Sequence, residues 1–573
     1  MGDTTGTRKL DRRNVLKMTA AGSIMATAGC LGLTDPETEL PDLQDQSDPD
    51  LDWTVDDINM GGEFVGTIGA NINAFDPINV SDTTSAKTTN LIYEGLTVVD
   101  FENEIHPCLA TDWEQIDDTT FEFSLEQGVQ FHDDYGEMTA EDVQVSIERY
   151  EDSPRHGDVF DWYESSEVID DYTIRIELWR PYAPFLSDMA GISIVPAEAG
   201  MDDEDGDIDL TNNPLGTGPY EFVEYRPDDL FRAERFDDYW WEGDDLTPDV
   251  APIETVTLHV IEEQGAQLAA LQGGDVDMIN SIDPEDVGMI QQNEDFTITQ
   301  TFSSGFDMLI YPLQLEPYSN EKVRRGITRL IPREEIVQNV VFHGHAQEAA
   351  HPISPSLGET YFDADFHERM NEEYVGEDHD RGVELVEEGF EELGIDAPYE
   401  TEIISNENPV RIAWAEVIQH TLNETGLFDV SLEEVEWATY VDMVLGEGSE
   451  ERDQLVALGW SGGADPDYQV NLLFNSEYNT PGCCNVNHYH SQEIEQLISD
   501  GVETFDDEER AEIYEDMSEI LCRESPMSFL WYGFAMDAIR DDTIVNWRTY
   551  YNDSGETTAI YTPQIGQVAW LNE

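Results

Sequence analysis

The feature that most constrains folding is the acidic excess of this chain. Its 126 Asp and Glu residues against 26 Lys and Arg residues give a net charge of −100 at pH 7. Such self-repulsion opposes a compact state in dilute buffer, but at molar salt the Debye length falls to ~3 Å and the repulsion is screened. We therefore predict a halophilic protein that folds at high salt.

The aromatic content distinguishes this chain from disordered acidic proteins. Such proteins have few aromatic residues, whereas Phe, Trp and Tyr make up 10% of this chain, enough for a packed core. Nucleic acid is excluded as a partner, because phosphate binding depends on clustered Lys and Arg and this surface would repel the backbone. Anionic lipid surfaces are repelled in the same way, and the sequence predicts no cofactor.

The N-terminus predicts export followed by lipid attachment. Arg12 and Arg13 precede a weakly apolar segment, 18–33, which is shorter than the ~20 apolar residues that a membrane-spanning helix needs. The arginine pair resembles a twin-arginine export signal, and Thr27-Ala28-Gly29-Cys30 resembles a lipobox. We expect residues 1–30 to be the signal, with Cys30 carrying a lipid that anchors an extracellular protein to the outer face of the cell membrane.

The remaining cysteines leave the disulfide pairing open. Cys108, Cys483, Cys484 and Cys522 are an even number in a compartment that permits disulfides, and three pairings exist. A bond between the neighbours Cys483 and Cys484 would close a strained ring. A bridge from one of them to Cys522 is therefore the favoured hypothesis.

Two groups of histidines are candidate metal ligands. They are His343-Gly344-His345 with His351, and His488-Tyr489-His490, and they would bind a transition metal only if their rings converged. No metal-binding motif accompanies them, so histidines in surface loops are the default expectation and no metal site is predicted.

The body of the chain is predicted to mix helices and strands. Residues 31–60 are rich in Asp, Pro, Gln and Glu and are expected to form an acidic linker. The ~510 residues that follow are too many for a single hydrophobic core, so their number predicts two or three domains. Alternating apolar residues predict strands at 121–125, 129–131 and 174–178. Thr139 with Asp142 predicts the capped start of a helix.

One motif suggests an enzyme. Gly459-Trp460-Ser461-Gly462-Gly463 matches the G-x-S-x-G motif of α/β-hydrolases, with His488 or His490 downstream as a base. That motif needs small residues beside the serine, whereas Trp460 and Pro466 predict an irregular loop. A secreted serine hydrolase using Ser461 is thus the alternative hypothesis. A binding loop is favoured, in which Trp460 offers an apolar wall and small residues admit a ligand.

Four blocks of sequence, in order, resemble the solute-binding proteins of ABC importers, family 5, the dipeptide, oligopeptide and nickel type. They comprise 75–77 with 91–96, 107–113 and 128–143; 213–220 with 238–240 and 270–277; 323–337; and 459–467 with 525–526. The spacing within the first block, from Phe75 to Val143, is highly specific, and the four blocks cover nearly the whole mature chain.

The resemblance implies an α/β fold of the periplasmic-binding-protein-like type II. Two lobes joined by hinge crossovers are expected, the first in 61–85, 211–305 and 530–573 and the second in 306–529, with an inserted subdomain in 86–210. The resemblance also implies a monomer that is not an enzyme, captures a peptide-like solute and delivers it to ABC permease subunits. Nickel or another metal chelate, and an oligosaccharide, are alternative cargoes.

The resemblance also implies where the ligand binds. In the peptide binders of this family an aspartate three residues after the Gly-Trp pair accepts the α-ammonium of the ligand, and Gly463 occupies that position here. We expect Trp460 and Asp465 to contact the ligand, and Gly463 to weaken ordinary peptide binding. Tyr220, as a wall of the cleft or as core, and Phe75 complete the predicted ligand-binding residues.

The charge of the chain generates a stability prediction. Transfer from molar salt to ~0.1 M lengthens the Debye length to ~10 Å, so repulsion among the acidic groups should loosen or unfold the protein. The measurement is the melting temperature as a function of salt concentration, and a constant value across that range would contradict the halophilic interpretation.

Overall fold

The computed structural model describes residues 53–80, 82–153, 160, 162–199, 208–479, 481, 484–552, 555–557 and 560–572, all within one compact unit, Ser47–Glu573. Arg12, Arg13, Cys30 and most of the predicted linker lie outside the described residues. Packing begins at Trp53, whose ring lies edge-on to Trp570 with the centroids 4.9 Å apart. Among the described helices, none is long and apolar enough to cross a membrane.

The first lobe is built on a four-stranded sheet with the order β1-β12-β11-β10. β1 (Glu63–Ile68) runs parallel to β12 (Thr255–Val260), and β12, β11 (Leu230–Arg235) and β10 (Tyr220–Arg226) pair antiparallel in turn. Phe64 is fully buried, since alternate side chains of these strands point into the core.

A separate four-stranded antiparallel sheet forms the inserted subdomain, with the order β4-β5-β9-β8. Its strands are β4 (Ala110–Asp117), β5 (Thr120–Leu125), β8 (Tyr163–Asp170) and β9 (Thr173–Leu178). The strands predicted at 121–125 and 174–178 are therefore confirmed, and they lie side by side. The strand predicted at 129–131 is the short β6 (Gln130–Phe131).

The helix predicted after Thr139 is also confirmed. It is α3 (Ala140–Glu151), and its first turn is closed by a capping box in which the backbone N–H of Thr139 donates to Asp142 Oδ2 over 2.7 Å. The Asp142 carboxylate also accepts from the Thr139 hydroxyl over 3.0 Å, so both groups of Thr139 at the helix start are satisfied, as the sequence pattern predicts.

The second lobe contains most of a larger sheet with the order β13-β20-β15-β19-β17-β18. The strands are β13 (Met278–Ile279), β15 (Phe306–Ile310), β17 (Tyr399–Asn406), β18 (Phe428–Val435), β19 (Leu455–Trp460) and β20 (Met527–Arg540). β14 (Phe296–Phe302) and β16 (Ala346–Glu348) also pair with β20.

Helices accompany each part of the chain. The first lobe carries α2 (Thr83–Thr89), α5 (Gln264–Gly273) and α6 (Pro284–Ile290), and the subdomain carries α3 and α4 (Phe185–Gly191). The second lobe carries α7 (Glu321–Leu330), α8 (Arg333–Glu335), α9 (Gly358–Tyr361), α10 (Ala364–Met370), α11 (His379–Leu393), α12 (Pro409–Glu424), α13 (Trp437–Leu445), α14 (Asp467–Phe474), α15 (Gln492–Glu503) and α16 (Asp507–Glu524).

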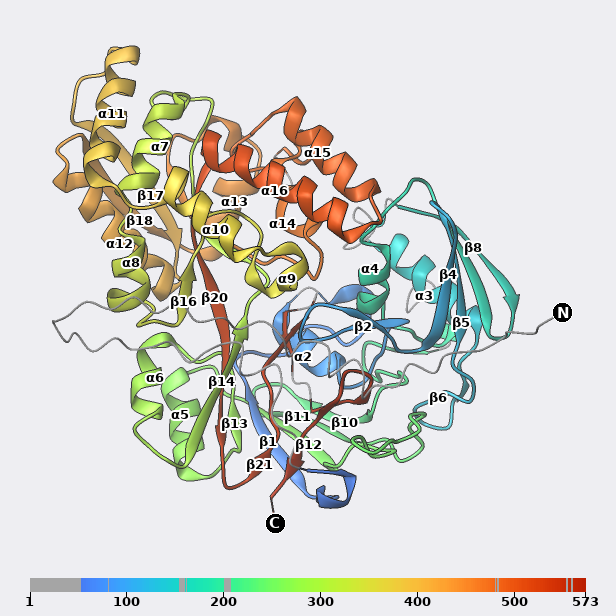
Figure 1. Ribbon diagram of the computed structural model, residues 1–573. Coiled ribbons are helices and arrows are strands. Elements are labelled where there is room, and N and C mark those ends of the chain that lie inside the picture. The colour runs from blue at the N-terminus through green and yellow to red at the C-terminus, as the bar shows by residue number, and fades with distance from the viewer. Residues whose placement is uncertain are drawn as a thin grey trace, which may run out of the picture. The chain divides into compact units, whose positions relative to one another are not determined.

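The chain crosses between the lobes along neighbouring strands. β14 leads through 303–305 into β15, and β20 runs antiparallel to both, from Met527 opposite Ile310 to Arg540 opposite Phe296 (Figure 1). Gly305 lies at the crossing, where a Cβ atom would overlap the carbonyl group of Trp460. The crossovers and the loop after β19 are therefore packed backbone against backbone.

Candidate functional site

Two cavities lie beside the crossing strands and share lining residues. The first has a volume of about 460 Å³ and the second about 370 Å³. Both fall in the size range of pockets that hold small ligands, roughly 300–1,000 Å³. Ile282, Ser303, Phe534 and Met536 line both cavities, so the two cavities adjoin, and we refer to them together as the groove.

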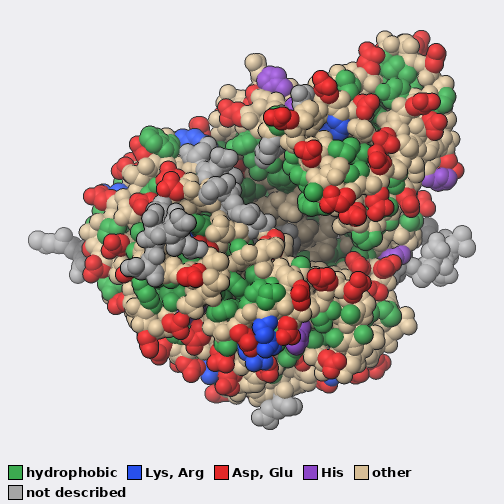
Figure 2. All heavy atoms as spheres, turned by 180° about the vertical axis from the view of Figure 1, so that it is seen from behind, with side chains coloured by type: hydrophobic (Ala, Val, Ile, Leu, Met, Phe, Trp, Pro, Cys, Tyr) green, Lys and Arg blue, Asp and Glu red, His purple; other side chains and the backbone are tan. Residues whose placement is uncertain are grey.

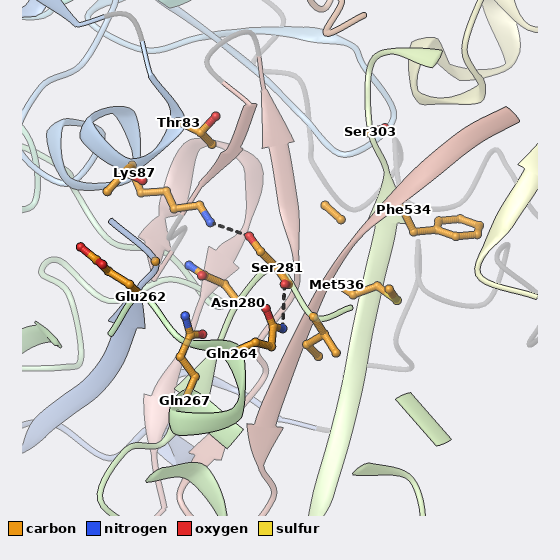
Figure 3. Close-up of a pocket in the computed structure, with 14 residues that line it drawn as sticks. Thr83, Lys87, Glu262, Gln264, Gln267, Asn280, Ser281, Ser303, Phe534 and Met536 are labelled. Carbon is orange, nitrogen blue, oxygen red and sulfur yellow. Dashed lines mark hydrogen bonds between the residues drawn. The ribbon is translucent and has the colours of Figure 1, made fainter. Parts of the chain in front are cut away.

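The first cavity is lined mainly by polar groups of the first lobe (Figure 3). Lys87 of α2 extends toward Ser281, and its Nζ lies 3.4 Å from Ser281 Oγ. The backbone carbonyl of Ser281 accepts a hydrogen bond of 3.1 Å from Gln264 Nε2. The chain has only four lysines, and one of them, Lys87, is 5% exposed and lines this cavity. The cavity therefore has a positively charged group in its wall.

Aromatic side chains of the second lobe line the second cavity. Trp460, at the end of β19, is half-buried, and its indole Nε1 donates to the carbonyl of Tyr468 over 2.8 Å. Phe342 and Trp414 line the same cavity. Trp460 is thus held in place as a flat apolar wall, and it is the one predicted ligand-binding residue that lines this groove.

The loop after Trp460 is packed more tightly than the sequence suggested. The Gly462 carbonyl accepts from Ser304 Oγ over 2.5 Å, and Gln469 Nε2 also donates to the Ser304 carbonyl. A Cβ on Gly462 would collide with Gln469. Gly462 therefore allows the loop to approach the crossover. The adjacent Gly463 is buried, while Ser461 is exposed and lines the cavity.

Asp465 forms a buried ion pair inside the second lobe. Its two carboxylate oxygens accept from Arg510 Nη1 and Nη2 over 2.6 and 2.7 Å, and the side chains of Asp465 and Arg510 are 7% and 3% exposed. Burial and the negative charge of Asp465 raise the pKa of the neighbouring Asp467 to about 7. The carboxylate that was predicted to face a ligand cation thus faces an arginine of α16.

Two other predicted ligand-binding residues lie in the core. Tyr220 is fully buried and its hydroxyl donates to the carbonyl of Ile253 over 3.2 Å. Phe75 is 7% exposed and packs on Phe222, with the ring centroids 5.3 Å apart. Of the two interpretations offered for Tyr220, the structure supports core.

The histidine groups predicted as candidate metal ligands do not converge in the described part of the chain. His343 is exposed, whereas His345 lines the second cavity with Nδ1 3.2 Å from Gln300 Oε1. His351 is buried against His367, and His490 pairs with Glu495. Among the described residues, the group that could hold a metal ion is Asp100, Glu104 and His106.

The predicted bridge to Cys522 is wrong. Cys522 and Cys108 are free, buried thiols, and Cys522 Sγ donates to the carbonyl of Ala350 over 3.1 Å. Cys484 is disulfide-bonded, to a cysteine outside the described residues. Cys522 is a residue of α16 and is buried against Phe366 and Met370 of α10, a setting that sequence spacing does not reveal and that explains the error.

Two charged residues of the second cavity were missed in the sequence. Asp307 and Arg411 both line the second cavity. Asp307 interrupts the otherwise apolar run Phe306-Asp307-Met308-Leu309-Ile310 of β15. A charge in the middle of a buried strand is a signal of function that the sequence did contain.

The ion pair of Asp465 generates a stability prediction. Asp465→Asn should lower the free energy of unfolding by about 3 kcal/mol or more, because it leaves the Arg510 guanidinium buried without its counter-charge. The measurement is chemical unfolding at molar salt. The control is Asp516→Asn, which changes an exposed aspartate on α16, the helix that carries Arg510. Equal stability of the two variants would contradict a structural role and favour the original prediction, in which Asp465 binds a ligand cation.

Comparisons with known proteins identify relatives of this chain. Its sequence is 23% identical over 475 residues to the glutathione-binding protein GsiB of Salmonella typhimurium, covering 81% of this chain and 88% of that protein. It is 26% identical over 477 residues to the dipeptide-binding protein of Escherichia coli, covering 77% and 83%.

Solved structures have the same fold. DppA from Helicobacter pylori in complex with the peptide STSA superposes with a TM-score of 0.71 at 23% identity, over 90% of this chain and 99% of that one. NikZ from Campylobacter jejuni in complex with Ni(L-His) superposes with a TM-score of 0.70 at 21% identity, over 88% and 98%. The predicted type II α/β fold, with two lobes, hinge crossovers and an inserted subdomain, is confirmed.

A family model assigns the chain directly. The model of the bacterial extracellular solute-binding proteins, family 5, matches residues 104–481, which is more than half of the chain. The chain therefore belongs to the family 5 extracellular solute-binding proteins.

Proposed function

We propose that this protein captures a peptide-like solute outside the cell and delivers it to the permease subunits of an ABC importer, without acting as an enzyme. The observation that carries the proposal is the groove at the crossing strands, where Lys87 lines the first cavity and Trp460 and Arg411 line the adjoining second cavity. Glutathione-binding and dipeptide-binding relatives support a cargo of this class.

A groove at the crossover suits capture and release. Ligand contacts from both lobes favour the closed arrangement over the open one, and only this difference in affinity drives closure. Aromatic faces bury the apolar parts of many different side chains, while a few polar groups fix the orientation of the ligand. The described groove has both kinds of lining, as a peptide carrier requires.

The alternative from a different class of protein, a serine hydrolase, has weaker support. Ser461 lines the second cavity, but within the described residues it has no hydrogen bond to a histidine, and His490 instead pairs with Glu495. Nickel or another metal chelate stays an alternative cargo because His345 lines the groove and the neighbour NikZ was solved with Ni(L-His). An oligosaccharide also remains an alternative.

Export and anchoring complete the proposal. We assign Arg12 and Arg13 to a twin-arginine signal and Cys30 to the lipid site of a monomeric, haloarchaeal-like lipoprotein on the outer face of the membrane. On the face drawn in Figure 2, acidic side chains are spread widely and Lys and Arg form only small groups, which supports a halophilic surface. We also propose that the protein has the domains predicted from its sequence, with the first lobe in 61–85, 211–305 and 530–573, the subdomain in 86–210 and the second lobe in 306–529.

Trp460 provides the direct test of the binding site. Native mass spectrometry of protein purified at molar salt identifies the co-purified solute, and calorimetry then measures its affinity. Trp460→Ala should weaken binding by about 2 kcal/mol, because the ligand loses a rigid aromatic wall. Trp437→Ala, which removes an exposed tryptophan outside both cavities, is the matched control.

Two outcomes would contradict this placement. Unchanged affinity of Trp460→Ala for the identified solute would move the site elsewhere. Ser461→Ala should leave the affinity nearly unchanged in a binding protein, whereas loss of solute turnover in that variant would establish the hydrolase.

The lipid anchor has its own test. Cys30→Ser should release the protein into the medium, because a lipobox without its cysteine cannot be lipidated. Replacing Arg12 and Arg13 by lysine should instead retain the precursor in the cytoplasm. Fractionation of cells after a high-salt wash measures both results, and cell-associated Cys30→Ser protein would count against the lipobox.

A further inference from the structure

Asp307 and Arg411 both line the second cavity and interact electrostatically. Asp307 lies on β15, opposite Gly459 on β19 and Trp531 on β20, and Arg411 lies in the first turn of α12. Both side chains are partly exposed where they line the cavity. A carboxylate and a guanidinium are thus presented together in a groove that is otherwise rich in aromatic residues.

The missing side chain of Gly459 lets both charged groups come close to the same position. A Cβ atom on Gly459 would lie 2.9 Å from Arg411 Nη2 and 3.1 Å from Asp307 Oδ1. The two charged groups therefore both approach the same point beside Gly459. Hydrogen-bond distances to ligand nitrogen or oxygen atoms are of the same size, about 2.7–3.2 Å.

Arg411 is only partly satisfied by the protein. Its Nη1 donates to Asn406 Oδ1 over 2.7 Å, while its Nε is buried and has no hydrogen-bond partner. A guanidinium has five N–H donors in a planar fork that matches a carboxylate. The N–H groups of Arg411 other than the one that binds Asn406 are suited to an anionic group of a ligand.

Asp307 is an acid whose ionisation depends on its surroundings. Burial raises the pKa of Asp307 to about 6, against the opposing positive charge of Arg411. Tyr440, whose hydroxyl donates to the Ala457 carbonyl over 2.6 Å, interacts electrostatically with Asp307. His345, whose pKa is lowered by burial, lines the same cavity. At neutral pH, Asp307 is therefore mainly a carboxylate and His345 mainly neutral.

We propose that Asp307 and Arg411 form a subsite for a ligand end that carries an ammonium and a carboxylate on the same carbon atom. Asp307 accepts from the ammonium and Arg411 donates to the carboxylate. The inference rests on the proposed function and narrows its cargo to amino-acid-type ends, as in γ-glutamyl peptides, in place of ordinary α-peptide N-termini.

The subsite explains how a cation is recognised without an aspartate at position 463. The carboxylate is supplied by the crossover strand β15 instead of the loop after β19. An α-peptide N-terminus has an uncharged amide where this subsite presents Arg411, so it would leave that charge without a partner. Charge-assisted hydrogen bonds are the strong ones, and an unpaired partner is costly.

Two isomeric dipeptides test the subsite. γ-Glu-Ala and α-Glu-Ala have the same composition and charge, but only γ-Glu-Ala has its ammonium and a free carboxylate on one carbon. Calorimetry at molar salt and pH 7 should show tighter binding of γ-Glu-Ala by about tenfold or more. Asp307→Asn should remove most of that preference, and the exposed Asp429→Asn of β18 should keep it.

The pH dependence separates a binding role of Asp307 from a structural one. The carboxylate form accepts the ammonium, so the affinity for γ-Glu-Ala should fall by roughly tenfold for each pH unit below about 6 and level off above it. Arg411→Gln should move that midpoint upward, because it removes the positive charge that favours ionisation. Asp307→Asn should bind weakly with a nearly flat profile.

Each outcome has a distinct meaning. Equal affinity for the two isomers, or an unchanged preference in a folded Asp307→Asn variant, would overturn the subsite and leave a peptide carrier intact. Absence of binding by both isomers, together with a co-purified solute that is not peptide-like, would overturn the proposed function and the subsite together. Melting curves at each pH confirm that the variants are folded.

Discussion

The antiparallel ladder between β20 and the pair β14 and β15 is the constraint on which both lobes depend. One strand of fourteen residues contributes to separate cores: Met536 and Ala538 pack with Leu271 in the first lobe, while Leu530 and Trp531 pack in the second. Because alternate residues of a strand point to opposite faces, a shift of the ladder by one residue would displace both sets at once. The register of β20 therefore couples the folding of the two lobes.

The few basic residues of the chain are used to bind backbone as well as acids. Arg324 donates to the carbonyls of Ser525, Tyr318 and Glu524, and Arg333 donates to those of Phe529, Val375 and Thr328. Burial lowers the pKa of Arg333 to about 10, so the group stays charged at neutral pH. Bonds from buried cations to carbonyl groups are screened little by salt. The interior thus keeps its polar contacts at the ionic strength that the acidic surface demands.

Local elements were predictable from the sequence, and most of the site was not. Residues close together in the sequence determine the strands β5 and β9 and the capping box of Thr139 and Asp142. A local sequence pattern is therefore enough to predict them. The partner of Asp465 is Arg510, 45 residues later on α16, and no spacing rule predicts their contact. Trp460 was found because an aromatic residue among small ones is visible locally. Asp307 was visible too, but its pairing with Gly459 is a matter of sheet register.

The groove touches the crossing strands themselves. Ser303 follows β14 and Phe534 and Met536 belong to β20, and all three line both cavities. If the lobes rotate about these crossing strands, a solute bound there lies close to the rotation axis, where the lever arm is short. A small displacement at the solute then corresponds to a large displacement at the distant rims of the lobes. Solutes that differ by a single methylene would accordingly set different closing angles, and a permease that contacts both rims would sense cargo size through the separation of those rims.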